Sequence, residues 1–172
     1  MRNVLFLLGH LNDLDIEWMI NSGEKTNLEV GDRLIRKGET IDNLYIVLSG
    51  QLSITDGSSD KSIAIIGAGE ILGEMSFLEA RAPSVSVIAI EPVTVYCISR
   101  ELMNHRLENN VEFKANFYYV ISLFLSNRLR KTTSQLGYGS EEEADTIDEN
   151  VLDGVSQAGT RFVQILQKFS EV

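Results

Sequence analysis

The segment from Gly69 to Glu79, which reads G-E-I-L-G-E-M-S-F-L-E, carries the side chains best suited to binding a small molecule. Gly73 precedes a short helix-forming stretch, and a glycine lets a ligand approach the backbone closely. The first N–H groups of a helix lack intrahelical partners and favour an anion such as phosphate. The carboxylate of Glu74 suits a sugar hydroxyl instead. The segment is consistent either with a site for a phosphorylated, ribose-bearing ligand or with a tight barrel corner that binds nothing.

Motifs of catalysis and metal binding are weak in comparison. Neither His10 nor His105 stands in a nucleophile-elbow motif. The stretch 67–73 reads G-x-G-x-x-x-G, one residue longer than the dinucleotide-binding fingerprint, and it follows predicted strands without a βαβ unit. Cys97 is the one cysteine, which excludes an internal disulfide and a Cys/His zinc site. We expect Cys97 to be a buried apolar side chain, and we expect no enzyme activity, catalytic residue, metal or cofactor.

Residues 27–99 must position this segment, and they have the pattern of an all-β barrel or sandwich. Short runs rich in β-branched residues alternate with glycine-bearing turns. Gly50 and the loop Asp56–Asp60 read as hairpin turns. The predicted strands are Asn27–Val30, Arg33–Arg36, Leu44–Leu48, Leu52–Thr55, Ser62–Ile66, Val85–Ile90 and Val93–Ile98.

Helical periodicity flanks the predicted strands on both sides. Residues 12–22 predict a short helix that Asn12 caps and Gly23 ends. Residues 101–136 have a helical period, and a long helix over about 111–136 carries two adjoining apolar stripes. One stripe would cover the β domain and the other would meet a second copy, so we expect a homodimer. The first stripe is Phe113, Phe117, Val120 and Phe124, and the second is Tyr118, Ile121, Leu125 and Leu129.

The end of the chain differs in charge from the rest. Residues 138–172 carry eight acidic and two basic residues, with six carboxylates in Glu141–Glu149. We expect a domain over residues 1–137, an acidic linker over 138–147 and an amphipathic helix over 148–172. Apolar residues at heptad spacing on that last helix predict a packing partner, in the same chain or in a second copy.

The charge and hydropathy of the whole chain argue against some classes of binding partner. A formal net charge of −10 argues against general binding of nucleic acid and against docking on anionic lipid. The longest apolar run is far shorter than a membrane span, and the run Val4–Leu8 is too short for a secretory signal. We expect a cytoplasmic protein that binds neither DNA nor membranes.

Four glycine-containing motifs together resemble one known family. They are Gly31-Asp32, Lys37-Gly38-Glu39, the stretch Asp42–Leu52 and the stretch Gly73–Leu78. In type and order they resemble the cyclic nucleotide-binding domain family, which includes the bacterial cyclic-AMP receptor protein, the regulatory subunits of cyclic-AMP-dependent kinase and nucleotide-gated channels. The resemblance covers about residues 12–137. It implies a mainly β fold, a jelly-roll (double-stranded β-helix) with flanking helices, whose long C-terminal helix often dimerises and closes over a cyclic nucleotide.

The resemblance also assigns ligand-binding positions. Gly73 and Glu74 match the glycine and the ribose-binding glutamate of the family's phosphate-binding cassette. Met75 and Ser76 continue the cassette helix, whose N–H groups would face the cyclic phosphate.

One assigned position departs from the family pattern. The family's phosphate arginine falls where this sequence has Pro83, followed by Ser84, which matches a small hydroxyl residue, and Val85 on the next strand. Proline has no N–H to donate. Loss of a charge-assisted hydrogen bond weakens binding about ten- to hundredfold. Arg81 lies two residues earlier, and its long side chain could take over the contact.

Two functions follow from the resemblance. The first is a stand-alone sensor that binds cAMP or cGMP, or another small anionic ligand, and signals to a protein partner through helix movement. The second is a degenerate member whose pocket no longer binds nucleotide and which acts as a dimeric interaction module. After the long helix, the acidic residues 138–172 are too few for the helix-turn-helix of gene-regulating members, so we expect no DNA contact.

Overall fold

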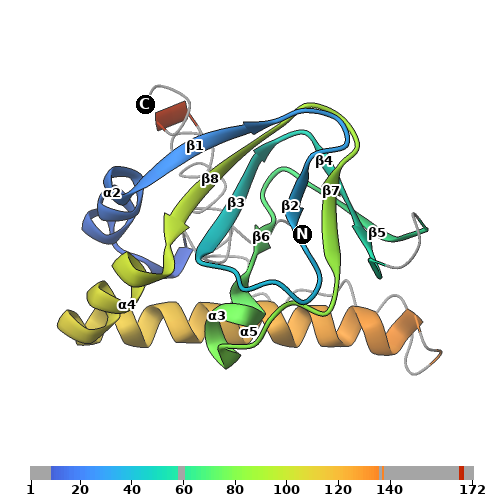
Figure 1. Cartoon of the computed structure of the whole chain (residues 1–172). Helices are drawn as coiled ribbons and strands as arrows, with labels where there is room; N and C mark the ends of the chain where they lie inside the picture. Colours follow the sequence, from blue (N-terminus) through green and yellow to red (C-terminus); the bar gives the residue numbers. More distant parts are fainter. Residues whose placement is uncertain (1–8, 58–60, 136, 138–166, 169–172) are drawn as a thin grey trace.

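A β domain flanked by helices forms the described part of the chain, which in this computed structural model comprises residues 9–57, 61–135, 137 and 167–168 (Figure 1). The helices are α2 (Asp13–Ser22), α3 (Glu74–Glu79), α4 (Arg100–Asn109) and α5 (Val111–Gln135). The strands are β1 (Gly23–Leu28), β2 (Arg33–Ile35), β3 (Asn43–Ser49), β4 (Gln51–Thr55), β5 (Ser62–Gly67), β6 (Ile71–Leu72), β7 (Ser86–Ala89) and β8 (Val93–Ser99). The acidic linker and the last predicted helix lie outside the described residues, apart from Gln167 and Lys168.

The strands form two four-stranded antiparallel sheets, with the orders β1-β8-β3-β6 and β2-β7-β4-β5. This arrangement confirms the predicted mainly β fold with flanking helices. The seven predicted strands are all present, although their ends differ by a few residues. Strand β6 was not predicted as a strand, because only two residues between glycine turns pair with β3.

Strand β1 begins earlier than the sequence pattern predicts. It starts at Gly23, which lies opposite Ile98 of β8, and the pairing continues to Leu28 opposite Val93. A Cβ atom at Gly23 would lie 2.4 Å from the Tyr96 ring, so the absence of a side chain permits this close approach. The glycine that ends helix α2 is therefore also the first residue of the sheet.

The alternation of side chains along β8 divides the interior into two apolar clusters. Val93, Val95 and Cys97 belong to the cluster between the two sheets, together with Leu52 and Val87 of the other sheet. Of the intervening residues of β8, Tyr96 and Ile98 belong to the cluster beneath the helices. Cys97 is a free, buried cysteine, as predicted.

Helix α5 runs beneath the β domain (Figure 1), and several of its apolar residues from Phe113 to Leu125 pack in the cluster beneath the helices. The predicted stripe of Phe113, Phe117, Val120 and Phe124 is buried throughout. The predicted second stripe is wrong in one member, because Ile121 is also buried. Its remaining members, which are exposed or half-buried, are Tyr118, Leu125 and Leu129.

The long helical region is divided at Asn110, whose backbone is extended. The side chain of Asn110 accepts a hydrogen bond of 2.8 Å from the N–H of Phe113 and so caps α5. Helices α4 and α5 are therefore separate elements. Within the described residues, the search for a helix with the length and hydropathy of a membrane span finds none.

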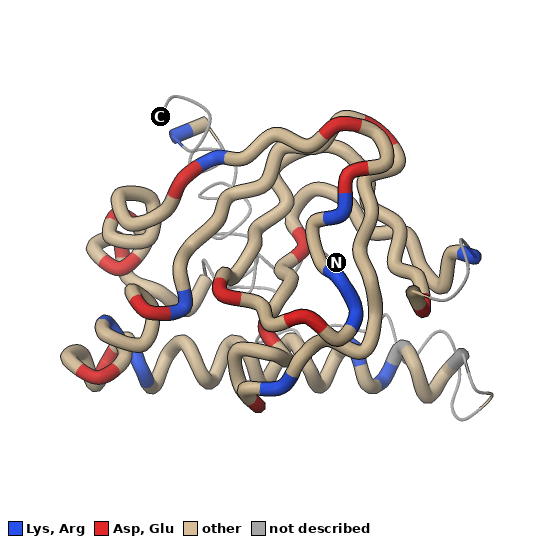
Figure 2. The backbone as a smooth tube through the Cα atoms, in the orientation of Figure 1, with Lys and Arg blue, Asp and Glu red and all other residues tan. Residues whose placement is uncertain are grey.

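Charged residues of both signs are interspersed over the strands and helices (Figure 2). Residues 1–137 carry seventeen acidic and thirteen basic residues, so most of the net charge of −10 belongs to residues 138–172. The domain itself is therefore only mildly acidic.

Candidate functional site

The glycine turn before α3 fixes the position of the candidate site. Gly73 has a φ of +87°, in the left-handed region, and a Cβ atom there would lie 2.8 Å from the carbonyl oxygen of Asn43. Both the backbone conformation and the contact require glycine. The Gly73 carbonyl accepts the N–H of Phe77 at 2.9 Å, which forms the first turn of α3. The turn therefore places the side chain of Glu74 in the interior of the domain.

Glu74 is buried and paired with an arginine from α5. Its side chain is 3% exposed, and its Oε1 lies 2.5 Å from Nη1 of Arg128, which is 34% exposed. The Arg128 guanidinium also lies 4.9 Å from the centre of the Phe124 ring, a cation–π distance. The pair joins α3 to α5, although its members are 54 residues apart in the sequence.

The charge of Glu74 depends on this arginine. Burial raises the pKa of the Glu74 carboxyl above its ordinary value, and the negative charge of Glu70 adds to the rise. Arg128 lowers the pKa but does not offset the burial. The carboxyl therefore depends on Arg128 for much of the stabilisation of its charged form.

The other predicted cassette residues have unequal environments. Ser76 is buried, whereas Met75 on the same short helix is exposed. Ala80 caps the C-terminal end of α3 and is the one described non-glycine residue with positive φ. Its N–H donates a hydrogen bond of 3.0 Å to the Ser76 carbonyl. The cassette thus presents Glu74 and Ser76 inward and Met75 outward.

The segment after α3 contains the position where the family has arginine. Pro83 is half-buried, and its carbonyl accepts the N–H of Gly38 at 2.9 Å. Ser84 is exposed and Val85 is half-buried. The Arg81 side chain is 82% exposed and lies 3.7 Å from Glu79, so it extends into solvent in this structure. The guanidinium that accompanies the cassette carboxylate is that of Arg128.

Sequence reasoning identified Glu74 but missed Arg128. The sequence places Arg128, with Arg130 and Lys131, near the C-terminal end of the long helix, where the helix dipole favours cations, and this explains the three charges without a partner from α3. Arg128 follows Phe124 by four residues, so it continues the buried stripe of α5. A cation on an apolar stripe indicates a buried acidic partner, and that spacing is the signal by which Arg128 could have been found.

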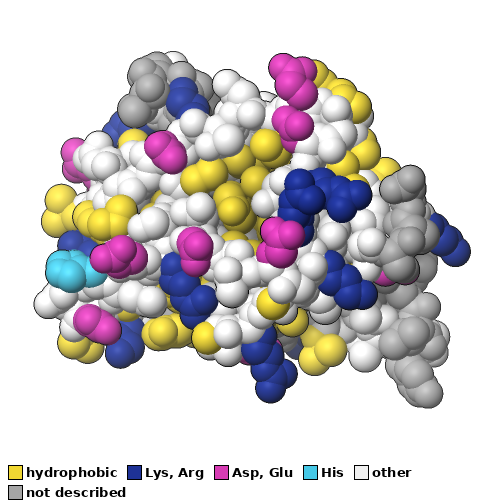
Figure 3. Space-filling view, viewed as in Figure 1, with side chains coloured by type: hydrophobic (Ala, Val, Ile, Leu, Met, Phe, Trp, Pro, Cys, Tyr) yellow, Lys and Arg dark blue, Asp and Glu magenta, His cyan; other side chains and the backbone are white. Residues whose placement is uncertain are grey.

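The interior between the two sheets is packed with apolar side chains. The cluster between the two sheets is flanked by partly buried residues, which are Leu28, Leu34, Ile41, Tyr45, Ile54 and Ile66. Apolar side chains gather near the centre of the face drawn in Figure 3, with Lys or Arg atoms beside them. Among the described residues, no group of three or more His, Cys, Asp or Glu side chains could hold a metal ion.

Comparison with known proteins gives a consistent result. The model of the family described as "Cyclic nucleotide-binding domain" matches residues 25–110. The cyclic AMP receptor protein of Thermus thermophilus is 28% identical over 117 residues, which cover 66% of this chain and 52% of that protein. The human voltage-gated delayed rectifier potassium channel KCNH1 is 31% identical over 103 residues, which cover 59% of this chain and 10% of the channel. This chain thus spans about half of the first relative and a small part of the second.

A solved structure of another protein has a fold similar to that of this chain. The cyclic nucleotide-binding domain from Methylobacillus flagellatus is similar with a TM-score of 0.69 and 20% identity, over 81% of this chain and 85% of that one. At this identity the likeness concerns the fold, a jelly-roll with flanking helices.

Proposed function

Because the chain belongs to the cyclic nucleotide-binding domain family, we propose that it is a non-catalytic regulatory module that binds cAMP or cGMP in its jelly-roll domain. The observation that carries the proposal is the ion pair between Glu74 of the cassette and Arg128 of α5. This pair lets a ligand at the cassette alter the position of the long helix. A ligand shifts such an equilibrium only by binding the two positions with different affinity.

The proposed ligand-binding residues are those that the family pattern assigns, together with Arg81. Gly73, Glu74 and Ser76 lie at or beside the interior, which supports their assignment. For Met75, Ser84 and Val85 the proposal rests on the family pattern alone, and for Arg81 it rests on its long side chain and its position two residues before Pro83. Because Pro83 replaces the phosphate arginine, we expect the affinity for cyclic nucleotide to be about ten- to hundredfold lower than an arginine would give.

Signalling is proposed to pass through α5 to a second copy and to a protein partner. Tyr118, Tyr119 and Leu129 are exposed apolar residues on α5, and they support a homodimer through this helix. DNA and membranes are not among the proposed partners, because the chain has a net charge of −10.

A second function is favoured by Pro83 together with the exposed Arg81. In this alternative the domain no longer binds nucleotide, and it acts as a dimeric interaction module.

Calorimetry of the full chain with cAMP and cGMP separates the two functions. Saturable heat below millimolar ligand supports the regulatory module, as does cAMP or cGMP released from the purified protein on denaturation and detected by mass spectrometry. No heat at millimolar concentrations of both nucleotides, and no released nucleotide, would support the interaction module.

The role of Arg81 is tested with two exposed arginines. Arg81→Ala should weaken binding about tenfold if Arg81 replaces the missing arginine. The matched control is Arg33→Ala on β2, which also removes an exposed arginine. Equal affinities of the two variants would reject the role of Arg81.

A further inference from the structure

The two arginine side chains near the cassette point in different directions, one into solvent and one toward the interior. Arg81 extends into solvent beside Glu79, and Pro83 offers neither a charge nor an N–H. Arg128 comes from α5 and directs Nη1 at the buried carboxylate of Glu74. About a third of the Arg128 side chain is exposed, so the ion pair with Glu74 leaves part of this side chain accessible. A guanidinium carries five N–H donors in a rigid fork that suits phosphate as well as carboxylate.

We propose that the anionic group of the ligand binds to Arg128 in place of Glu74, so that binding exchanges one anion for another on the same guanidinium. This inference rests on the proposed function and deepens it, because it names the residue that recognises the phosphate. It makes Glu74 a competitor of the phosphate. The family pattern makes Glu74 an acceptor for the ribose, so the two roles predict opposite effects of removing its charge.

The exchange of anions on Arg128 is coupled to proton uptake by Glu74. Two charged groups act on the Glu74 carboxyl, namely Arg128 from α5 and Glu70 from the turn before β6. Of these, Arg128 lowers the pKa of Glu74, whereas burial and Glu70 raise it. When the ligand occupies Arg128, the carboxyl loses part of the influence that kept it charged. The pKa of the carboxyl then rises further, so binding of the anion is accompanied by net uptake of protons from solvent.

A second consequence concerns pH. Because protonation of Glu74 frees Arg128, the affinity for an anion should rise as the pH falls toward the pKa of Glu74. The affinity for a neutral analogue should not rise, because it does not compete for the guanidinium.

The experiment compares cAMP with adenosine, which has the same base and ribose but no phosphate. Binding to the full chain is measured by calorimetry at pH 8 and pH 5.5, in pairs of buffers with different ionisation enthalpies. We expect tighter binding of cAMP than of adenosine, net proton uptake with cAMP only, and a stronger cAMP affinity at pH 5.5.

Three variants test whether Glu74 and Arg128 are responsible for the cAMP affinity and the proton uptake. Glu74→Gln, which imitates the protonated carboxyl, should bind cAMP about tenfold more tightly at pH 8 and should lose the proton uptake. Arg128→Gln should reduce the cAMP affinity to that of adenosine. Arg128→Lys keeps the charge without the planar fork and should lie between Arg128→Gln and the unaltered chain. The matched control is Arg130→Gln, an exposed arginine two residues further along α5, which should behave like the unaltered chain. Thermal unfolding confirms that each variant folds.

The results that would overturn this inference differ from those that would overturn the proposed function. Weaker binding of both cAMP and adenosine by Glu74→Gln would show that the carboxylate holds the ribose and does not compete with phosphate. Equal cAMP affinities of Arg128→Gln and Arg130→Gln would also overturn the inference, while nucleotide binding itself would stand. Absence of binding of either compound to the unaltered chain and to all folded variants would overturn both.

Discussion

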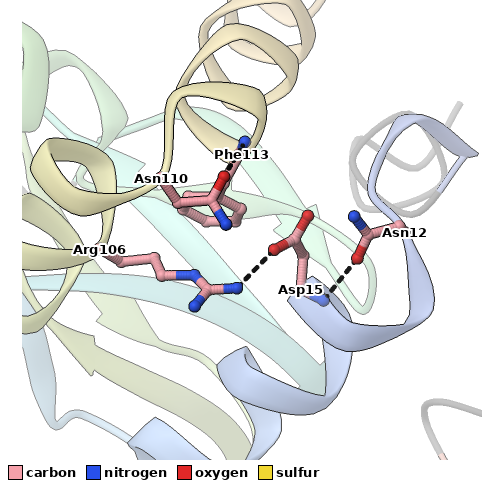
Figure 4. A network of polar contacts seen from close by, with 5 residues as sticks. All are labelled: Asn12, Asp15, Arg106, Asn110 and Phe113. Atoms are coloured by element: carbon pink, nitrogen blue, oxygen red, sulfur yellow. Dashed lines mark hydrogen bonds and ion pairs between the residues drawn. The ribbon is translucent and has the colours of Figure 1, made fainter.

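Arg106 donates a hydrogen bond of 2.7 Å from Nη2 to Oδ1 of Asp15, a residue 91 positions earlier in the chain (Figure 4). Asp15 belongs to α2 and is 1% exposed, whereas Arg106 lies in the last turn of α4. The Arg106 guanidinium also lies 5.3 Å from the centre of the Trp18 ring and 5.5 Å from that of Phe113. The pair therefore joins three helices at the junction where α4 ends and α5 begins.

Helix caps surround this ion pair. Asn12 accepts the N–H of Asp15 at 2.8 Å and caps α2, and Asn110 in the same way caps α5 (Figure 4). Among the described residues, neither the second carboxylate oxygen of Asp15 nor Nε of Arg106 has a hydrogen-bond partner, although both atoms are buried. Since a buried charge is costly unless it is paired, the single bond between Asp15 and Arg106 is important for the fold.

Removing the arginine should therefore destabilise the domain. Arg106→Met leaves the Asp15 carboxylate buried and unpaired, and we expect a loss of about 3 kcal/mol in the free energy of unfolding. Asp15→Asn retains the shape and one acceptor, so its loss should be smaller, about 1–2 kcal/mol. Urea unfolding followed by the fluorescence of Trp18, the one tryptophan of the chain, measures both. Arg130→Met is the matched control and should lose less than about 0.5 kcal/mol. A loss that small for Arg106→Met would contradict the assigned role.

The two arginine–carboxylate pairs mark the limit of what local patterns predict. Side-chain patterns and glycine turns were sufficient for seven of the eight strands, because side chains alternate between the two faces of a strand and turns separate the strands. Helical spacing was sufficient for the buried phenylalanines of α5. The partners of Glu74 and Asp15 were not predictable in this way, because they lie 54 and 91 residues away and depend on how α5 and α4 pack.

Substitution of Gly73 should test the turn that delivers Glu74. Gly73→Ala forces a side chain into positive φ and places its Cβ 2.8 Å from the Asn43 carbonyl oxygen. Gly31 has a similar φ of +93°, but a Cβ there would have open space. Gly31→Ala should therefore lose only the conformational cost of about 1 kcal/mol. Urea unfolding should show a loss for Gly73→Ala that is larger by at least about 1 kcal/mol. Equal losses would show that the contact with Asn43 relaxes freely.

The raised pKa of Glu74 predicts a pH dependence of stability. Because the folded-state pKa lies above the ordinary value of 4.5, the folded protein binds this proton more tightly than the unfolded chain does. The resulting contribution to stability is fully present below pH 4.5 and is lost as the pH rises through the folded-state pKa. Urea unfolding at pH values from 4 to 8 should show this loss in the unaltered chain relative to Glu74→Gln, since both share all other titrating groups. A constant difference between the two proteins over that range would contradict the raised pKa.

The exposed apolar side of α5 predicts the effect of a charge on dimerisation. Leu129 is 65% exposed and lies near the C-terminal end of the helix, where an exposed leucine is costly unless a partner covers it. Leu129→Glu should shift the full chain from a dimer to a monomer of 19.2 kDa in light scattering. The matched control is Leu14→Glu on α2, which also adds a charge at an exposed leucine and should leave the mass unchanged. A monomer in the unaltered chain, or dissociation by both substitutions alike, would contradict a dimer interface on α5.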